Sequence, residues 1–468
     1  MPLILPSNSI SAGGYEVDNS LRFDDGSSDY LNKTLSSGNT QKWTISFWIK
    51  KMIGSGALLS VGTSGNYDQI YFNANKFAYY SATGGSDDFF IYSEQVFRDS
   101  SAWYHIVLSV DTTQATASNR VKLYVNGEQV TTFDASNVYP SQNFNGRINS
   151  ASQHNIGNRI YDSAFYFSGH MAEVCFVDGQ QLDPTSFGEF DEDTGIWKPI
   201  DVSGLTFGTN GFYLDFENSG SLGADVSGNG NNFTVNNLTS IDQTTDTCTN
   251  NFATGNSLLK NPSNTLTFSE GNLKIVTDAS SRQNGFSTIG VTTGKWYGEF
   301  KLSSDADNKA MIGIANGSGA SETSRNNSFL GTETATVSFY NSGTKYIDGS
   351  SSSYGNSYAS GNIIGIALDL DNSAVYFSIN GTFQNSGDPT SGASKTGAIS
   401  FTKGDDFWFM GFGDGSTSGA GVTWEANFGN PAFTISSGNS DGNGYGNFEY
   451  SVPSGYYALN TKNLAEFG

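Results

Sequence analysis

Hydrophobic and polar residues alternate with a period of two along much of the chain. Every second residue is large and apolar at positions 44–50, 104–110 and 121–125. Because successive side chains of a β-strand point to opposite faces, this pattern predicts strands with one buried face. Asn126-Gly127 directly follows the third segment, and this pair suits a two-residue hairpin turn because both positions tolerate positive φ.

The same succession recurs about half a chain later. Apolar residues alternate at positions 364–370 and 375–379, Asp369 and Asp371 flank the turn between them, and Asn380-Gly381 follows. No long segment carries the 3.6-residue period of a helix. The sequence therefore predicts an all-β fold of two tandem antiparallel jelly-roll β-sandwiches.

A polar segment rich in Gly, Asn and Ser separates the two strand-rich regions. We expect an N-terminal arm at residues 1–16, a first sandwich at 17–218, a connector at 219–267 and a second sandwich at 268–468. Within the connector, Phe233-Thr234-Val235 is the segment suited to pair with a neighbouring strand. The Ser/Gly/Tyr-rich run at 341–361 predicts one long exposed loop or a loose hairpin.

Composition narrows the possible functions. Aromatic residues make up 14% of the chain, which suffices to fill real cores. The 23 Lys and Arg against 45 Asp and Glu give a net charge of −22, which disfavours nucleic-acid binding. We expect no membrane insertion and no signal peptide, because the start lacks a basic region and no apolar run is long enough to span a bilayer. Cys175 and Cys248 are expected as free thiols, with a disulfide as the open alternative.

Short motifs resemble two known domain types. The runs at 43–50 and 123–127 resemble laminin-G-like, concanavalin-A-like domains. The runs at 296–300, 312–315 and 375–381 resemble a SPRY domain. The resemblance implies a concanavalin-A-like sandwich followed by a SPRY-like sandwich, both from families that mostly bind carbohydrate or protein.

The combination of motifs is similar to virion proteins of marine bacteriophages, on the runs at 187–199, 211–216, 225–233 and 453–460. This resemblance implies a non-enzymatic protein on the virion surface, made in the host cytoplasm. The favoured hypothesis is a fibre- or spike-type adhesin, on the phage tail or head, that binds host surface glycan or protein. The alternatives are a structural decoration or connector protein of the capsid or tail and, less favoured, a polysaccharide depolymerase. Expected partners are other virion proteins, contacted through the arm, and further copies of the chain, with a trimer as the first candidate.

A glycosidase needs two carboxyl groups flanking the scissile bond. The nearest match is the acidic run from Glu189 through Asp191 to Asp193, but flanking glycines indicate a solvated turn, so we expect no catalytic residues. None of the histidines pairs with a recognisable nucleophile or forms a transition-metal cluster, so a structural role is expected for His105, His154 and His170.

Binding is the remaining chemistry. Sugar sites combine aromatic faces with amide, carboxyl and backbone groups. Packing on loop surfaces or in an oligomer interface is the competing interpretation for each candidate aromatic residue. The candidates are Tyr161, Phe165 and Tyr166 in the first domain and Tyr346, Tyr354 and Tyr358 in the second.

No cofactor is expected, with calcium as the open exception. Calcium prefers oxygen ligands, which Asp225 with Asn229, or Asp87 with Asp88, could supply. Neither run has the spacing of a known calcium loop, so ordinary turn-forming residues are the favoured interpretation.

Overall fold

The computed structural model describes residues 14–260, 266–278, 281–417 and 419–468. The chain forms two units that divide between Asn250 and Asn251, within the segment predicted as a connector. We call them the N-terminal and the C-terminal unit. Most of the predicted arm, residues 1–13, lies outside the described residues. Strands dominate both units, so the predicted all-β class is confirmed.

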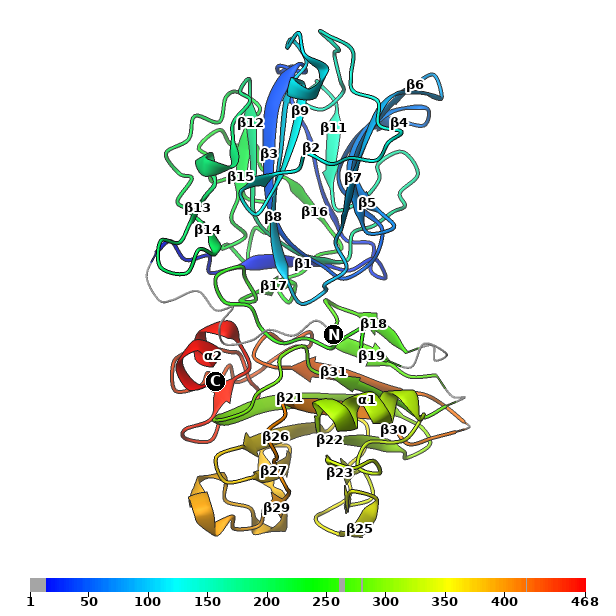
Figure 1. Ribbon diagram of the computed structural model, residues 1–468, viewed down its shortest axis with the longest axis vertical. Coiled ribbons are helices and arrows are strands. Elements are labelled where there is room, and N and C mark those ends of the chain that lie inside the picture. The colour runs from blue at the N-terminus through cyan, green and yellow to red at the C-terminus, as the bar shows by residue number, and fades with distance from the viewer. Residues whose placement is uncertain (1–13, 261–265, 279–280, 418) are drawn as a thin grey trace. The chain divides into compact units, whose positions relative to one another are not determined.

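Two antiparallel sheets lie face to face in the N-terminal unit (Figure 1). The first sheet contains, in spatial order, β10 (Glu128–Gln129), β9 (Val121–Val125), β8 (Trp103–Asp111), β3 (Lys42–Lys51), β12 (Gly169–Asp178), β1 (Ser20–Phe23) and β17 (Gln243–Thr244), with β15 (Phe212–Leu214) beside β12. The second contains β16 (Thr234–Asn236), β2 (Tyr30–Thr34), β11 (Gln153–Ile156), β4 (Gly56–Thr63), β5 (Asn66–Asn73), β6 (Lys76–Thr83) and β7 (Ser86–Val96). A separate hairpin joins β13 (Gly188–Phe190) to β14 (Trp197–Pro199).

The predicted alternation builds the core between these sheets. Ile45, Phe47 and Ile49 of β3 are fully buried against the second sheet. The turn after β9 has φ of 48° at Asn126 and 82° at Gly127, as the hairpin prediction requires. Residues predicted as a connector contribute to this unit, because β16 pairs with β2 and β17 pairs with β1.

The C-terminal unit is a second sandwich. Its nine-stranded sheet contains β18 (Thr267–Ser269), β19 (Lys274–Val276), β31 (Val422–Asn427), β21 (Lys295–Asp305), β26 (Ile363–Asp369), β27 (Ala374–Ile379) and β28 (Thr382–Phe383), with β29 (Ile399–Ser400) beside β27 and β32 (Tyr457–Ala458) parallel to β21. Its six-stranded sheet contains β20 (Gln283–Phe286), β30 (Trp408–Asp414), β22 (Ala310–Asn316), β23 (Thr336–Tyr340), β24 (Thr344–Ile347) and β25 (Ser350–Ser353). The helices are α1 (Gly317–Arg325) and α2 (Thr461–Phe467), and α1 lies along the six-stranded sheet (Figure 1).

Three of these four sheets have an outer side covered by apolar side chains from elsewhere in the same unit. Phe187 and Phe207 cover the first sheet of the N-terminal unit at Cys175. Phe448 covers the nine-stranded sheet, and Ala320 of α1 covers the six-stranded sheet. The outer side of the β16–β7 sheet is different, and its side chains form the candidate site below.

Two further expectations meet the structure directly. Both cysteines are free, which agrees with the favoured of the two alternatives. The run at 341–361 contains the β24–β25 hairpin, but it returns to the core afterwards and is not exposed throughout. Within the described residues, neither helix has the length and hydrophobicity needed to cross a lipid bilayer.

Candidate functional site

Aromatic side chains gather on the outer side of the strands β4 to β7. On β5, Ile70 and Phe72 point into the core, so Tyr67, Gln69 and Tyr71 point outward. Rings from β6, β7 and the loop at 158–166 join them. We call this surface the tyrosine face and define it by Tyr67, Gln69, Tyr71, Tyr80, Phe90, Tyr92, Arg159, Tyr161 and Phe165.

The loop at 158–166 is fixed on β4 by hydrogen bonds. The Ser60 hydroxyl donates to the Asn158 carbonyl at 2.8 Å and accepts from the Ile160 amide at 2.9 Å. At the other end of the loop, the Ala57 amide donates to the Phe165 carbonyl at 2.8 Å. These bonds hold the loop aromatics over the sheet, so the face is ordered before any ligand arrives.

The rings form two contacting groups, which Arg159 joins through Tyr161 and Phe165. The centroid of Tyr67 lies 5.4 Å from that of Tyr80 and 4.3 Å from that of Tyr161. Tyr71 is buried beneath Phe165, at 6.4 Å between centroids, and its hydroxyl lies 2.6 Å from that of Tyr92. These spacings lie within the range of favourable aromatic contacts.

Arg159 holds the two loop aromatics in place. Its Nε and Nη2 donate to the two carboxylate oxygens of Asp162, at 3.0 and 2.5 Å. The guanidinium carbon lies 4.9 Å from the ring centroid of Tyr161 and 4.3 Å from that of Phe165. The hydrogen bonds that Arg159 donates lower the pKa of Asp162 and raise the pKa of Arg159, so the pair stays ionised.

Polar atoms between the rings supply hydrogen-bonding capacity. Gln69 is 3% exposed, and its carbonyl Oε1 is buried without a hydrogen-bond partner. Burial raises the pKa of Tyr161 to about 12, and burial with a hydrogen bond to Asp87 raises that of Tyr80 as well. The phenols therefore stay protonated near neutral pH. The face offers apolar rings, O–H groups and one unsatisfied acceptor, the combination that a sugar requires.

Comparison with domain families covers both units. Residues 25–181, which include the tyrosine face, match the family model of the concanavalin A-like lectin/glucanases superfamily. Residues 295–405 match the SPRY domain. The chain contains a concanavalin A-like domain and a SPRY domain. These folds bind carbohydrate or protein, which is compatible with a binding role without catalysis.

Solved structures show distant likenesses to parts of the chain. The SPRY domain of human HERC1 is 15% identical and has a TM-score of 0.26, with 33% of this chain and 87% of that chain covered. The PSpry domain of TRIM65 is 13% identical with a TM-score of 0.27, covering 37% and 91%. A heptameric SAP-like pentraxin from Limulus polyphemus is 15% identical with a TM-score of 0.27, covering 36% and 78%. A comparison with curated proteins gave no match.

Of the aromatic residues predicted in the concanavalin A-like domain, Tyr161 and Phe165 lie on the tyrosine face. Tyr166 is half-buried beside Tyr30 of β2, and their ring centroids are 6.4 Å apart. Sequence reasoning missed the rings on β5, β6 and β7. The signal was present, because Tyr67 and Tyr71 occupy the positions that alternate with the core residues of β5.

The candidates in the SPRY domain lie in a different setting. Tyr354 and Tyr358 are only 5% and 3% exposed and belong to the hydrophobic core, so the expectation of exposed loop rings is wrong for them. The hydroxyl of Tyr358 donates to the Phe339 carbonyl at 2.8 Å, which satisfies it internally. Tyr346 is half-buried against Phe329, with ring centroids 5.1 Å apart.

The predicted calcium ligands hold loops. The carboxylate of Asp225 accepts backbone N–H groups from Tyr213, Ser227 and Asn231, and the Asn229 amide donates to two carbonyl groups. No cluster of three or more His, Cys, Asp or Glu with metal-binding geometry occurs among the described residues. Calcium binding at this loop stays a prediction.

The second predicted pair, Asp87 and Asp88, is separated by its contacts. Asp87 accepts from the Tyr80 hydroxyl on the tyrosine face at 2.5 Å. Asp88 accepts from the hydroxyls of Ser81 and Thr83, at 3.1 and 2.7 Å. Adjacent strand residues point to opposite sides, so the two carboxylates do not converge on one ion.

The acidic run near Glu189 begins on β13, which contains Glu189, and only its second half, after Asp191, is the expected turn. Asp191 accepts from the amide and hydroxyl of Thr194 and from Lys198, and these bonds lower its pKa to about 2. A general acid in a glycosidase needs a raised pKa instead. Asp191 therefore anchors a turn.

All three histidines are buried. His105 contacts Ser46 through Nε2 at 2.8 Å and accepts from the Trp197 indole at 2.9 Å, while burial lowers its pKa to about 3. Burial also lowers the pKa of His154 to about 4 and that of His170 well below its usual range. These neutral, packed rings agree with the expected structural role.

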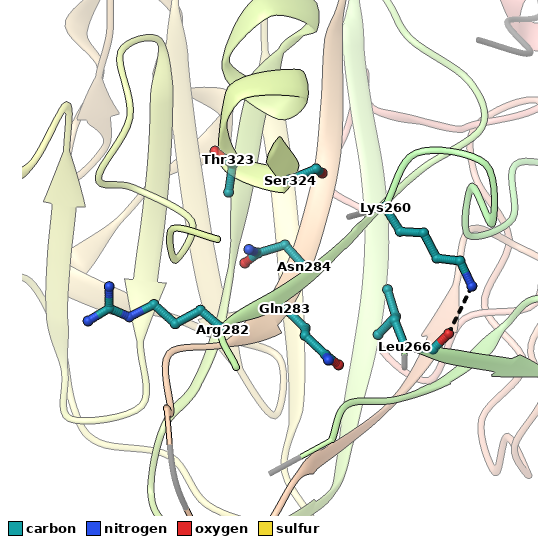
Figure 2. A pocket seen from close by; sticks show the side chains of 7 residues that line it. All are labelled: Lys260, Leu266, Arg282, Gln283, Asn284, Thr323 and Ser324. Atoms are coloured by element: carbon teal, nitrogen blue, oxygen red, sulfur yellow. Dashed lines mark hydrogen bonds between the residues drawn. The ribbon is translucent and has the colours of Figure 1, made fainter. Parts of the chain in front are cut away.

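A small hollow in the C-terminal unit lies between Lys260, Arg282 and the buried Thr323 (Figure 2). Figure 2 shows that Lys260 and Arg282 extend in opposite directions, away from Thr323. Lys260 donates to the Leu266 carbonyl at 3.2 Å. Because the two cations do not converge, this hollow lacks the charge arrangement of an anion site.

Proposed function

We propose that this chain is a non-enzymatic binding protein whose tyrosine face holds carbohydrate. The observation that carries the proposal is the packed group of rings around the buried, unpartnered acceptor of Gln69. A buried acceptor without a partner costs about 1–3 kcal/mol, and a ligand hydroxyl would recover that cost. The concanavalin A-like match of residues 25–181 supports the same class of ligand.

The shape of the tyrosine face favours a sugar that stacks on the rings over a ligand that is enclosed in a pocket. The rings of Tyr67, Tyr80 and Tyr161 form a platform on a sheet, and a platform accepts successive sugar units of a chain more readily than a single small molecule. Such shallow contacts bind weakly one at a time. Presentation of several copies on one particle would raise the effective affinity by 10²–10⁴, roughly.

The more specific form of the proposal is a fibre- or spike-type adhesin on a phage virion, acting as a homo-oligomer. It rests on the resemblance of the combined motifs, such as residues 187–199 and 453–460, to virion proteins. A binding surface carried on a rigid sandwich suits display on a particle. Partner virion proteins would be contacted away from the tyrosine face, which must stay accessible.

Binding of the purified full chain to an array of polysaccharides tests the proposal. We expect Tyr161→Ala to weaken binding of the best polymer by roughly tenfold, or about 1.4 kcal/mol, because one of the three platform rings is lost. Tyr346→Ala in the SPRY domain is the matched control and should bind as wild type does. Equal binding by wild type and Tyr161→Ala would contradict the assignment of the face.

Incubation of the same polymer with the protein tests the absence of catalysis. We expect no new reducing ends, because Asp191 of the one acidic run considered for catalysis is ionised and anchors a turn. A steady release of reducing ends would favour the depolymerase alternative over an adhesin.

A further inference from the structure

The charges on and around the tyrosine face are predominantly negative. The face contains one arginine, Arg159, whereas Arg147 binds Asp68 on the inner side of the same sheet. Asp87 is exposed and accepts from the Tyr80 hydroxyl, and Asp162 lies on the loop above the sheet. The aspartates at the face therefore outnumber the arginines.

Both arginines are already engaged. Arg159 binds Asp162 through two nitrogens, and its planar group lies against two rings. Arg147 lies 3.2 Å from the buried carboxylate of Asp68 and donates to the Thr83 hydroxyl at 2.7 Å. An acidic ligand would have to separate one of these pairs, and a buried or bidentate pair resists separation.

From this arrangement we infer that the tyrosine face takes glycan chains that carry no acidic groups and excludes polyuronates and sulfated polysaccharides. This inference deepens the proposed function and rests on it. The rings and the Gln69 acceptor recognise sugar hydroxyls, which every glycan has. The paired arginines and the excess of aspartate then select among glycans by charge, because like charges at an interface cost affinity.

The net charge of the whole chain acts in the same direction. A value of −22 repels an anionic polymer at long range, but this general repulsion is screened within about 8 Å at physiological salt. The local aspartates lie in contact with the face, so their effect persists at that salt. Salt dependence therefore separates local selection from general repulsion.

The test measures binding of two uncharged polymers, dextran and mannan, and one polyuronate, alginate, in 20 and 150 mM salt. We expect at least one uncharged polymer to bind equally at both salt concentrations and alginate to bind measurably but roughly tenfold or more weakly than that polymer at both. Alginate bound as tightly as the best uncharged polymer would overturn the inference and leave the proposed function standing. Binding of none of a broad polysaccharide panel would instead overturn the proposed function.

Two substitutions locate the selection. Asp162→Asn removes one carboxylate and releases Arg159, so alginate binding in 150 mM salt should rise by roughly threefold to tenfold over wild type. Asp405→Asn makes the same charge change at an exposed position of the C-terminal unit and is the control. Equal gains in both variants would show a general charge effect and contradict selection at the face. Absence of any gain in Asp162→Asn would contradict it as well.

Discussion

Outward-pointing tyrosines occur on one sheet of each unit, but they have opposite fates. On the nine-stranded sheet, Tyr297 and Tyr376 point to the outer side and are fully buried, because Phe448 and Tyr456 of the C-terminal segment pack over them. On the tyrosine face, Tyr67 and Tyr80 stay partly exposed, and only Tyr71 is buried, beneath Phe165. The alternation along a strand fixes which way a ring points, and a covering segment decides whether the ring becomes core or surface.

Glu299 on the covered face and Gln69 on the tyrosine face differ in their hydrogen bonding. Beneath the C-terminal segment, the carboxylate of Glu299 accepts from the backbone amides of Glu449 and Tyr450, both at 2.8 Å, and from the Tyr297 hydroxyl at 3.1 Å. On the tyrosine face, Oε1 of Gln69 is buried without a partner. The carboxylate of Glu299 on the covered face is satisfied from within the unit, whereas the Ser378 hydroxyl on that face and Oε1 of Gln69 on the tyrosine face are buried without a partner.

The largest expected effect comes from removing a ring of the covering segment. Phe448→Ala should lower the free energy of unfolding by about 3–5 kcal/mol, because a fully buried ring leaves a cavity against Tyr297. Phe165→Ala removes the same side chain from the tyrosine face, where it is 36% exposed, and should cost clearly less. Urea unfolding measures both. Similar losses would mean that the two faces are equally structural.

A pH-dependent effect of about 3 kcal/mol is expected at Glu299. Burial raises its pKa from 4.5 to about 7, so between these pH values the folded state keeps a proton that the unfolded state has lost. The contribution of this group to stability is therefore largest below pH 4.5 and falls as pH rises to 7. The experiment compares urea unfolding of wild type and Glu299→Gln at pH 4.5 and 7.5. From pH 4.5 to 7.5, the free energy of unfolding of wild type should fall by that amount relative to that of Glu299→Gln. A difference between the two proteins that stays the same at both pH values would contradict the prediction.

The sequence predicted the sandwiches well and the site only in part. Alternation around Ile45, Phe47 and Ile49 is a local signal, and the core follows it. Tyr161 and Phe165 were found because they stand in a polar loop. Tyr354 stands in an equally polar run yet lies in the core, since the segment after β25 returns to the sandwich interior. Coverage depends on contacts between residues far apart in the sequence, so periodicity carries no information about it.

A smaller effect tests the unpartnered acceptor of the tyrosine face. Gln69→Leu should weaken glycan binding by roughly five- to tenfold, or about 1–1.4 kcal/mol, because a hydrogen bond to a sugar hydroxyl is lost. The free energy of unfolding should stay within about 1 kcal/mol of wild type, since Oε1 has no partner and the amide loses only its contact with the Tyr71 hydroxyl. Calorimetric titration and urea unfolding give the two values. A large loss of stability with unchanged binding would identify Gln69 as part of the core.

The smallest effect separates stacking from hydrogen bonding on the face itself. Tyr80→Phe keeps the ring beside Tyr67 and loses only the hydroxyl that donates to Asp87. That hydroxyl is already engaged by an exposed carboxylate, so its loss should change glycan affinity by less than about threefold and stability by about 0.5 kcal/mol or less. Tyr80→Ala, which removes the ring as well, should weaken binding more, because stacking is then lost. If Phe and Ala at this position weaken binding equally, the hydroxyl carries the interaction, and the tyrosine face differs from the covered face by its donors rather than by its exposed rings.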